Sequence, residues 1–436
     1  MTRRLGLMSR SLALCGVALL TLGQGACSEV VEVLSAASGA GGEPLAHAGA
    51  PQAGTTQAGS GGAAGENPDA PGGSATGGAR PIDPLLGISV DAGDAHGCAI
   101  RYGALFCWGA GADGRLGLGD LDDRESATRV GDDADWRAVA TGVAHTCALK
   151  TDGSVWCFGA NTVGQLGQGT TESSSVPLRV PLSGSVAQLS SEANTACAVF
   201  ETGELYCWGR NWEGNIGLND THPGVDQLSP VRSGDFDDWN LSGTGDGHTC
   251  GVRGVGLLYG WGRNTAANLG LGQNDEAQRR SATRIGTDED WTSVVSGQDS
   301  SCGLRLGGRL FCWGGNSFGN LGLGDRELRL VPTQVVAARV WTQVAIDTFH
   351  GCGIDADDNL YCWGRGIEGQ LGTSDNDERL EPELIGPSYA QVAVGRMFSC
   401  AVTLAGDVEC TGENAAGQLG LPGKMRRNTF TELSFP

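Results

Sequence analysis

The sequence is poor in aromatic and in basic residues. Aromatic side chains make up 6 % of its 436 residues, and 29 Lys and Arg face 50 Asp and Glu, which gives a formal charge of −21. Such an acidic chain has no electrostatic basis for holding phosphate backbones, so nucleic acid is not an expected partner. Glycine, in contrast, is abundant: its 73 residues are about 17 % of the chain against a usual ~7 %. This excess favours many short strands joined by tight turns.

Motifs of catalysis and of phosphate binding are also absent. The sequence holds no GxxxxGK[ST] loop, and no nucleophile stands out beside a base. We therefore expect no catalytic residue, no cofactor and no enzymatic activity.

The N-terminus has the pattern of an export signal. Three arginines among the first ten residues precede an apolar run over 12–22, which is about half the ~20 residues of a membrane-spanning helix. The small residues before Cys27 resemble the lipobox of bacterial lipoproteins. This resemblance makes residues 1–26 a lipoprotein-type signal peptide and Cys27 the lipidated residue. Ordinary cleavage after Ala26 is the alternative.

Residues 27–83 are predicted to be a flexible Gly/Ala-rich linker. The stretch 31–80 has 26 Gly or Ala among its 50 residues and no Trp, Tyr or Phe, so it cannot bury enough apolar surface to offset its ordering entropy. Ser28 follows the lipidation cysteine, which by analogy with Gram-negative lipoproteins favours the outer membrane. We expect a protein of the bacterial cell envelope, attached to the membrane through its lipid alone, with secretion as the alternative.

Residues 84–436 contain an internal repeat of about fifty residues. Its most regular step is an aromatic residue followed by glycine, with Thr411-Gly412 as the seventh copy; the other six are Trp108-Gly109, Phe158-Gly159, Trp208-Gly209, Trp261-Gly262, Trp313-Gly314 and Trp363-Gly364. In the second unit, apolar residues alternate on both sides of Asp152-Gly153, which is a hairpin signal, and a run near 176–180 adds a fourth strand. Seven units of four strands predict an all-β fold, a seven-bladed β-propeller.

The repeat resembles that of the regulator of chromosome condensation (RCC1) family. The shared signature joins Ala-x-Gly-x-x-His, Asp-Gly, Trp-Gly-x-Asn and Gly-Gln-Leu-Gly; its Asn place is held by Asn161, Asn211, Asn264, Asn316 and Asn414, and Gln-Leu-Gly recurs at 165–167, 370–372 and 418–420. The resemblance implies an RCC1-like seven-bladed propeller. It leaves the function open, because members act in nucleotide exchange on a nuclear GTPase, in ultraviolet sensing and in β-lactamase inhibition.

Twelve cysteines recur in pairs at facing positions of the predicted hairpins. In the second unit a three-residue turn at 151–153 sets Cys147 opposite Cys157, within disulfide range. We predict six hairpin disulfides, which an oxidising compartment favours; buried thiols are the alternative. The pairs are Cys98 and Cys107, Cys147 and Cys157, Cys197 and Cys207, Cys302 and Cys312, Cys352 and Cys362, and Cys400 and Cys410. Cys250 faces Gly260 and is left as a buried free thiol.

The histidines and the acidic turns have structural interpretations. Four histidines precede a cysteine by two residues, as half of a zinc site would: His96, His145, His248 and His350. Other units place Thr195, Ser300 or Phe398 there, so we expect hydrogen-bonded structural histidines and no metal. Acidic clusters at 132–135, 235–238 and 288–290 each run into a tryptophan. Calcium binding is one interpretation, and solvated turns between strands are the favoured one.

We expect a non-catalytic, monomeric scaffold that binds a protein or polysaccharide partner through one loop-rich face. The acidic charge favours basic partners. The loop 220–238, with Trp239 at its exit, is the predicted contact together with Trp212; a variable surface insertion is the alternative. A secreted enzyme inhibitor and a guanine-nucleotide exchange factor remain alternative functions, although export would separate the latter from a cytosolic GTPase.

Overall fold

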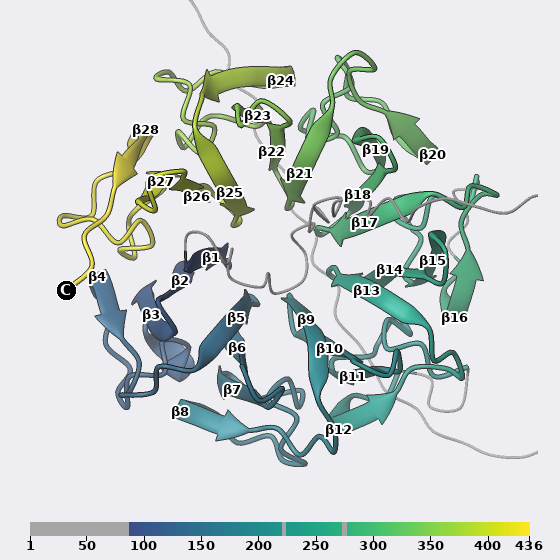
Figure 1. Ribbon diagram of the computed structural model, residues 1–436, viewed down its shortest axis with the longest axis horizontal. Helices are drawn as coiled ribbons and strands as arrows, with labels where there is room; N and C mark the ends of the chain where they lie inside the picture. Colours follow the sequence, from purple (N-terminus) through teal and green to yellow (C-terminus); the bar gives the residue numbers. More distant parts are fainter. Residues whose placement is uncertain (1–86, 220–223, 273–276) are drawn as a thin grey trace, which may run out of the picture. The chain divides into compact units, whose positions relative to one another are not determined.

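The computed structural model describes residues 87–219, 224–272 and 277–436. They form seven four-stranded antiparallel sheets, arranged as blades around a central axis (Figure 1). The predicted all-β, seven-bladed β-propeller is therefore confirmed. The predicted signal peptide, Cys27 and the linker 27–83 lie outside the described residues, as do residues 84–86. Within the described ranges, no helix approaches the length and apolar character that crossing a bilayer requires.

Each blade consists of four consecutive strands that follow one another outward from the axis. The innermost strands are β1 (Ile88–Ala92), β5 (Trp136–Thr141), β9 (Val186–Glu192), β13 (Trp239–Thr244), β17 (Trp291–Ser296), β21 (Trp341–Ile346) and β25 (Tyr389–Val394). The second strands are β2 (His96–Arg101), β6 (His145–Lys150), β10 (Thr195–Phe200), β14 (His248–Arg253), β18 (Ser300–Arg305), β22 (His350–Asp355) and β26 (Phe398–Thr403).

The outer half of each blade holds its third and fourth strands. The third strands are β3 (Ala104–Gly109), β7 (Val155–Gly159), β11 (Leu205–Gly209), β15 (Leu257–Gly262), β19 (Arg309–Gly314), β23 (Leu360–Gly364) and β27 (Val408–Gly412). The outermost strands are β4 (Arg124–Arg129), β8 (Ser174–Arg179), β12 (Gln227–Arg232), β16 (Arg279–Arg284), β20 (Arg329–Gln334), β24 (Arg379–Gly386) and β28 (Arg427–Glu432). A 3-10 turn, η1 (Ala112–Gly114), follows β3. We number the blades 1 to 7 in chain order.

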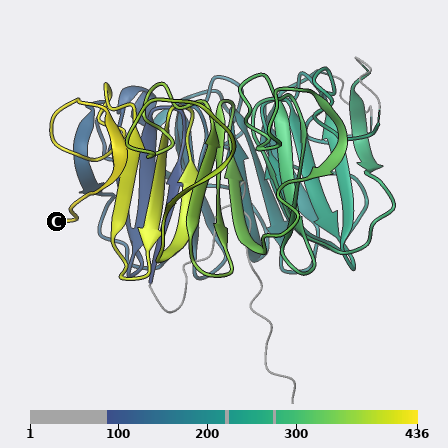
Figure 2. The ribbon, with the colours of Figure 1, turned by 90° about the horizontal axis from the view of Figure 1, so that it is seen from above.

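The alternating strand directions sort the loops onto two faces, because the strands run along the propeller axis (Figure 2). One face carries the loops from innermost to second strand and from third to outermost strand; we call it the mouth face. The opposite face, the turn face, carries the tight turns between second and third strands and the connections between blades.

The predicted hairpin register and all six predicted disulfides are confirmed. Cys147 pairs with Cys157 across β6 and β7, and the two Cα atoms of every bonded pair lie 4.1 Å apart. Blade 4 has the same register without the bond, because Cys250 faces Gly260. Burial raises the pKa of the free Cys250 thiol to about 11, so this cysteine stays protonated at neutral pH.

Buried tryptophans of the third strands connect five of the seven blades to the preceding one; blade 2 has Phe158 at this position. The indole N–H of Trp208 donates to the backbone carbonyl of Gln165 at 3.0 Å. Trp108, Trp261, Trp313 and Trp363 make the same kind of bond. In blade 7 the Thr411 hydroxyl replaces the indole and donates to the carbonyl of Gly369 at 2.9 Å. The tryptophans thus pack at the junctions between blades, and the replacement of the aromatic residue by Thr411 in blade 7 leaves that junction bonded.

The four histidines are structural, as predicted, and each connects its own blade to the following one. Their Nε2 atoms lie 2.7 to 2.9 Å from a Ser or Thr hydroxyl of the next blade; the pairs are His96 and Thr146, His145 and Ser191, His248 and Ser301, and His350 and Ser399. Burial lowers the pKa of His145, His248 and His350 to about 3. The imidazoles are therefore neutral at physiological pH.

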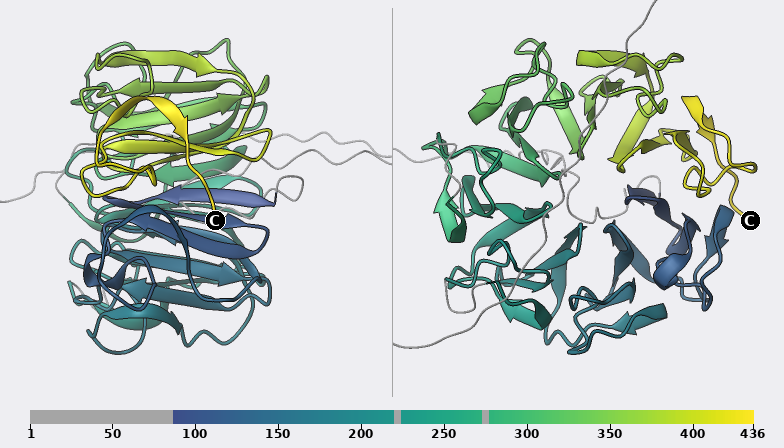
Figure 3. Two further views of the ribbon diagram at one scale, coloured as in Figure 1. Left: turned by 90° about the vertical axis from the view of Figure 1, so that its left-hand side faces the viewer. Right: turned by 180° about the vertical axis from the view of Figure 1, so that it is seen from behind.

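The ring closes where blade 7 meets blade 1 (Figure 3). The two blades share no strand, so side chains make the junction. The Gln391 amide donates to the carbonyl of Val90 at 3.0 Å, and the Val90 N–H donates back to the Gln391 Oε1 at 3.2 Å.

An aromatic ring from beyond β28 completes the core of blade 1. In blade 5, Trp291 opens the innermost strand and packs on Phe311 and Trp313, with ring centroids 5.6 and 5.9 Å away. Blade 1 has Gly87 at the corresponding position, nine residues before the histidine place. Phe435 fills this space instead and packs on the corresponding rings, which belong to Phe106 and Trp108, at 5.2 and 6.4 Å.

Candidate functional site

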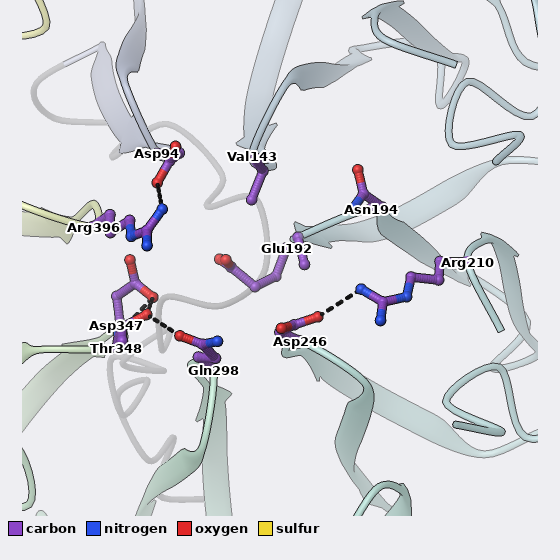
Figure 4. Close-up of a pocket in the computed structure, with 11 residues that line it drawn as sticks. Asp94, Val143, Glu192, Asn194, Arg210, Asp246, Gln298, Asp347, Thr348 and Arg396 are labelled. Carbon is purple, nitrogen blue, oxygen red and sulfur yellow. Dashed lines mark hydrogen bonds and ion pairs between the residues drawn. The ribbon is translucent and has the colours of Figure 1, made fainter. Parts of the chain in front are cut away.

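The mouth face is hollowed on the propeller axis. A cavity of about 170 Å³ lies there, and every blade contributes to its wall through the loop that follows the innermost strand (Figure 4). In blade order the contributing residues include Asp94, Val143, Glu192, Asp246, Gln298, Asp347 and Arg396. A second space of about 20 Å³ also borders Glu192, between the ends of the innermost strands, and has room for about one water molecule.

Two of these residues stand where the repeat otherwise has glycine. Glu192 in blade 3 and Asp347 in blade 6 hold the place that is Gly93, Gly142, Gly245, Gly297 or Gly395 in the other blades. A Cβ at Gly142 would lie 2.3 Å from the His145 ring, so the histidine of the repeat favours glycine here. Blade 3 has Thr195 in place of the histidine, and the smaller side chain leaves room for Glu192, whereas blade 6 carries Asp347 beside a histidine, His350.

Both carboxyls lie where negative charge is disfavoured. Burial raises the pKa of Glu192 well above its usual range, and the nearby carboxylates of Asp347 and Asp246 add to the effect. Asp347 is only 7 % exposed, and burial raises its pKa to about 6 even though the N–H and hydroxyl of Thr348 donate to it at 2.6 and 3.0 Å. Across the described residues, neither carboxyl has an ion-pair partner.

Two ion pairs flank these carboxyls at the rim of the cavity. Arg210 Nη1 lies 3.2 Å from Asp246 Oδ1, and Arg396 Nη1 lies 3.2 Å from Asp94 Oδ1 (Figure 4). Each pair joins neighbouring blades and uses the charge of its own aspartate. The centre of the mouth is therefore a concave site with two acids that form no ion pair, although the rise that burial causes in the pKa of Asp347 is partly offset by the nearby charge of Arg396. Such a site suits a cationic group.

The acidic turns take part in ion pairs on the turn face. Lys150 Nζ lies 2.7 Å from Asp133 and 3.0 Å from Asp135. Arg253 and Arg305 pair in the same way with acids of the later clusters, at Asp238, Asp288 and Asp290. These carboxylates stabilise connections between strands. No cluster of three or more His, Cys, Asp or Glu side chains within the described ranges is arranged to hold a metal ion.

The two tryptophans predicted to contact a partner differ in position. Trp212 is 54 % exposed on the mouth face, and the guanidinium of Arg210 lies 4.4 Å from its ring centroid. The prediction for Trp239 is wrong. It is 3 % exposed, because it opens β13 and packs on Trp261 and Tyr259 in the core of blade 4. Of the predicted contact loop 220–238, residues 220–223 lie outside the described residues, and Gln227–Arg232 form strand β12 rather than a loop.

Glu192 and Asp347 were not predicted from the sequence. The available signal was the replacement of glycine by an acid in two of the seven repeats. Aligned repeats reveal that replacement, but the meeting of the two acids on the axis depends on the closed ring.

The fold and its repeat define a seven-bladed propeller of the RCC1 class. The RCC1-like domain family matches residues 104–434, and the chain belongs to this family. The ultraviolet-B receptor UVR8 of Arabidopsis thaliana is 32 % identical over 247 residues, which are 55 % of this chain and 55 % of that protein. The chain thus spans about half the length of this curated relative.

Two solved structures are similar to the propeller. Yeast RCC1 (Prp20), solved with Kap60 bound to it, matches with a TM-score of 0.67 and 25 % identity, over 76 % of this chain and 83 % of that chain. Human WBSCR16 matches with a TM-score of 0.68 and 21 % identity, over 76 % of this chain and 94 % of that chain, and supports the fold alone.

Proposed function

We propose that this protein is a non-catalytic binding scaffold whose mouth face holds a protein partner, with a basic side chain of the partner in the axial cavity. The observation that carries the proposal is the pair Glu192 and Asp347, two acids at the centre of the ring that form no ion pair among the described residues. The formal charge of −21 favours approach of basic partners. One relative with this fold, yeast RCC1 (Prp20), is itself bound by a protein, Kap60.

The rigidity of the ring supports this role. Six disulfides staple the hairpins, and the indole and imidazole hydrogen bonds join neighbouring blades. A preformed site loses little conformational entropy when a partner binds. The two acids are thus held in place before the partner arrives.

The proposed scaffold acts at the bacterial cell envelope as a lipoprotein-type family member, tethered through Cys27 and the linker 27–83. Intact-mass spectrometry of protein from the envelope fraction tests the tether. We expect a lipid adduct on a chain beginning at Cys27, and a gain of about 2 Da per disulfide on reduction. An unprocessed chain in which the twelve cysteines of the six pairs are all reduced would rule out the envelope location.

Site-specific photo-cross-linking tests the binding face. A photoreactive amino acid replaces Val143 beside the cavity or, as the control, Val255 on the turn face; both valines are exposed. We expect one discrete protein adduct from position 143 and none from position 255. The adduct should be lost in the double variant Glu192→Gln and Asp347→Asn and kept in Glu201→Gln, which removes an exposed acid on the turn face. Adducts that are insensitive to the double variant would contradict the proposal.

A further inference from the structure

Another cavity, which we call the lateral cavity, opens on the mouth face beside the axial one. It measures about 270 Å³ and lies between the loops that follow β15 and β19, at 265–266 and 315–318. Thr348 lines both cavities, so the two adjoin along its side chain. The Thr348 hydroxyl is fixed there by contacts with Gln298 and Asp347, each at 3.0 Å.

The polar side chains around this lateral cavity are engaged within the protein. Asp299 pairs with Arg263 at 2.8 Å. The Asn316 amide donates to the carbonyl of Asp325 at 2.9 Å, and the Asn320 amide donates to the hydroxyl of Ser300 at 3.1 Å. What the cavity offers to a ligand is therefore mostly its apolar wall.

Phe318 and Leu328 form that wall. The Phe318 ring packs edge-to-face on Phe349, with ring centroids 4.9 Å apart, and the guanidinium of Arg365 lies 4.8 Å from the Phe349 ring. Phe318 is thus supported from behind, while Leu328 remains exposed. The volume is slightly below the ~300–1,000 Å³ of small-molecule sites, which suits a side chain better than a whole cofactor.

We propose that the axial and lateral cavities form one composite site for a polypeptide segment that carries a basic residue close to an aromatic or large aliphatic residue. The basic side chain enters between Glu192 and Asp347, and the apolar side chain packs against Phe318 and Leu328. This inference rests on the proposed function and adds the chemistry of the partner. A polypeptide supplies an adjacent cation and apolar group, whereas a neutral saccharide supplies no cation.

Panning a phage-displayed library of random dodecapeptides on the full chain tests the composite site. We expect enriched peptides that place Lys or Arg within a few residues of Phe, Trp, Leu or Met. The selected peptide is then synthesised and titrated against two matched variants. Thr265→Trp obstructs the rim of the lateral cavity, and Thr202→Trp makes the same change at an exposed turn on the opposite face.

The expected result is about a tenfold loss of affinity for Thr265→Trp and no change for Thr202→Trp, with equal melting temperatures. Replacing the apolar residue of the peptide by Ala should lower its affinity for the unmodified protein by a similar factor. The same replacement should lower the affinity for Thr265→Trp only slightly, because the peptide change and the protein change remove the same contact. Glu192→Gln should lower the affinity for the peptide by the same factor whether or not Thr265→Trp is present.

Three outcomes would overturn the composite site. If Glu192→Gln lowers the affinity for the peptide, but neither Thr265→Trp nor replacement of the apolar residue changes it, the lateral cavity takes no part in binding. The proposed function then stands without the composite site. If binding ignores Glu192 as well, the mouth face does not recognise basic partners and both proposals are wrong. A library that yields no enriched peptide also contradicts the composite site, while the cross-linking experiment still decides the proposed function.

Discussion

At the scale of single residues, the glycine position of the repeat decides what each blade presents to the axis. In five blades this position is glycine, and an added Cβ would come too close to a neighbouring ring or carbonyl, as at Gly142 and Gly395. Blades 3 and 6 present Glu192 and Asp347. Two replacements among otherwise equivalent positions thus place two carboxyl groups at the centre of the mouth face.

The raised pKa values of these acids make cation binding depend on pH. A basic ligand favours the ionised carboxyl, so binding releases protons, and affinity should rise between pH 5 and pH 7 as Asp347, whose pKa is about 6, loses its proton. Calorimetric titration of the selected peptide, in buffers of different ionisation enthalpy, measures both the affinity and the number of protons released. The double variant Glu192→Gln and Asp347→Asn should flatten the profile. An unchanged slope in that variant would assign the pH dependence to groups other than Glu192 and Asp347.

His248 makes the stability of the fold depend on pH. Its pKa is about 3 in the folded protein and about 6.5 when unfolded, so between these values the unfolded state takes up a proton that the folded state excludes. The free energy of unfolding therefore falls as the pH drops from 6.5 towards 3. His248→Phe copies Phe398, which holds the same place in blade 7, and removes this effect.

At pH 7 the His248→Phe variant loses the bond to Ser301 and should be about 1 kcal/mol less stable than the unmodified protein. At pH 4 the deficit should shrink or reverse. Urea unfolding at the two pH values measures it, and a deficit that stays constant would mean that His248 is not held neutral.

At the scale of elements, the hairpin of β14 and β15 shows that the disulfide is dispensable for the blade. Cys250 and Gly260 face each other in the register that bonded pairs use, such as Cys302 and Cys312. The register is therefore set by strand alternation and the tight turn. The disulfides add stability to a hairpin that these features already specify.

Gly260→Cys should create a seventh disulfide. A Cβ at Gly260 would lie 3.6 Å from the Cys250 Sγ, and the side-chain ends of Ile285 and Leu269 at 2.9 and 3.2 Å would have to shift. We expect a bond that closes a short loop and adds less than about 3 kcal/mol. Thiol counting and thermal unfolding measure the outcome, with Gly260→Ser as the control for packing. Two free thiols in the variant would show that the neighbouring side chains do not yield.

At the scale of the whole molecule, ring closure depends on side chains contributed after the last strand. Phe435 packs on Phe106 and Trp108, where blade 5 uses its own Trp291. The guanidinium of Arg101 lies 5.1 Å from the Phe435 ring, as that of Arg305 lies 5.7 Å from Trp291. The junction between blades 7 and 1 thereby gains the aromatic core that blade 1 lacks at Gly87.

Phe435→Ala should weaken this junction more than the loss of an aromatic ring elsewhere in blade 7, at Phe430. We expect a loss of about 2 kcal/mol, below the ~3–5 of a fully buried phenylalanine, because Phe435 is only partly buried. Hydrogen exchange should rise in β1 and β25 together. Phe430→Ala, which removes a ring from β28 that packs on Tyr389, is the control and should leave exchange in β1 unchanged. Exchange in β1 that is equal in both variants would contradict a closing role for Phe435.

Contacts between residues close along the chain were predictable from the sequence. The fifty-residue repeat, the alternation around Asp152-Gly153 and the facing cysteines depend on strands joined by short turns, and the predicted register and disulfides agree with the structure. Local geometry limits these contacts to few arrangements. The structural role of the histidines was also predictable from the repeat, but their hydroxyl partners in the next blade were not.

Contacts between distant blades required the folded ring. The burial of Trp239, wrongly predicted as a surface contact, depends on the ring of Trp261 in its own blade. It also depends on Val199 and Leu205 of blade 3, which share its core cluster. Glu192 and Asp347 belong to blades 3 and 6, and they meet only because seven blades close into a ring that directs the ends of the innermost strands to one axis. A periodic sequence specifies each blade, while the angle between blades, set by side-chain packing across every junction, determines which loops converge.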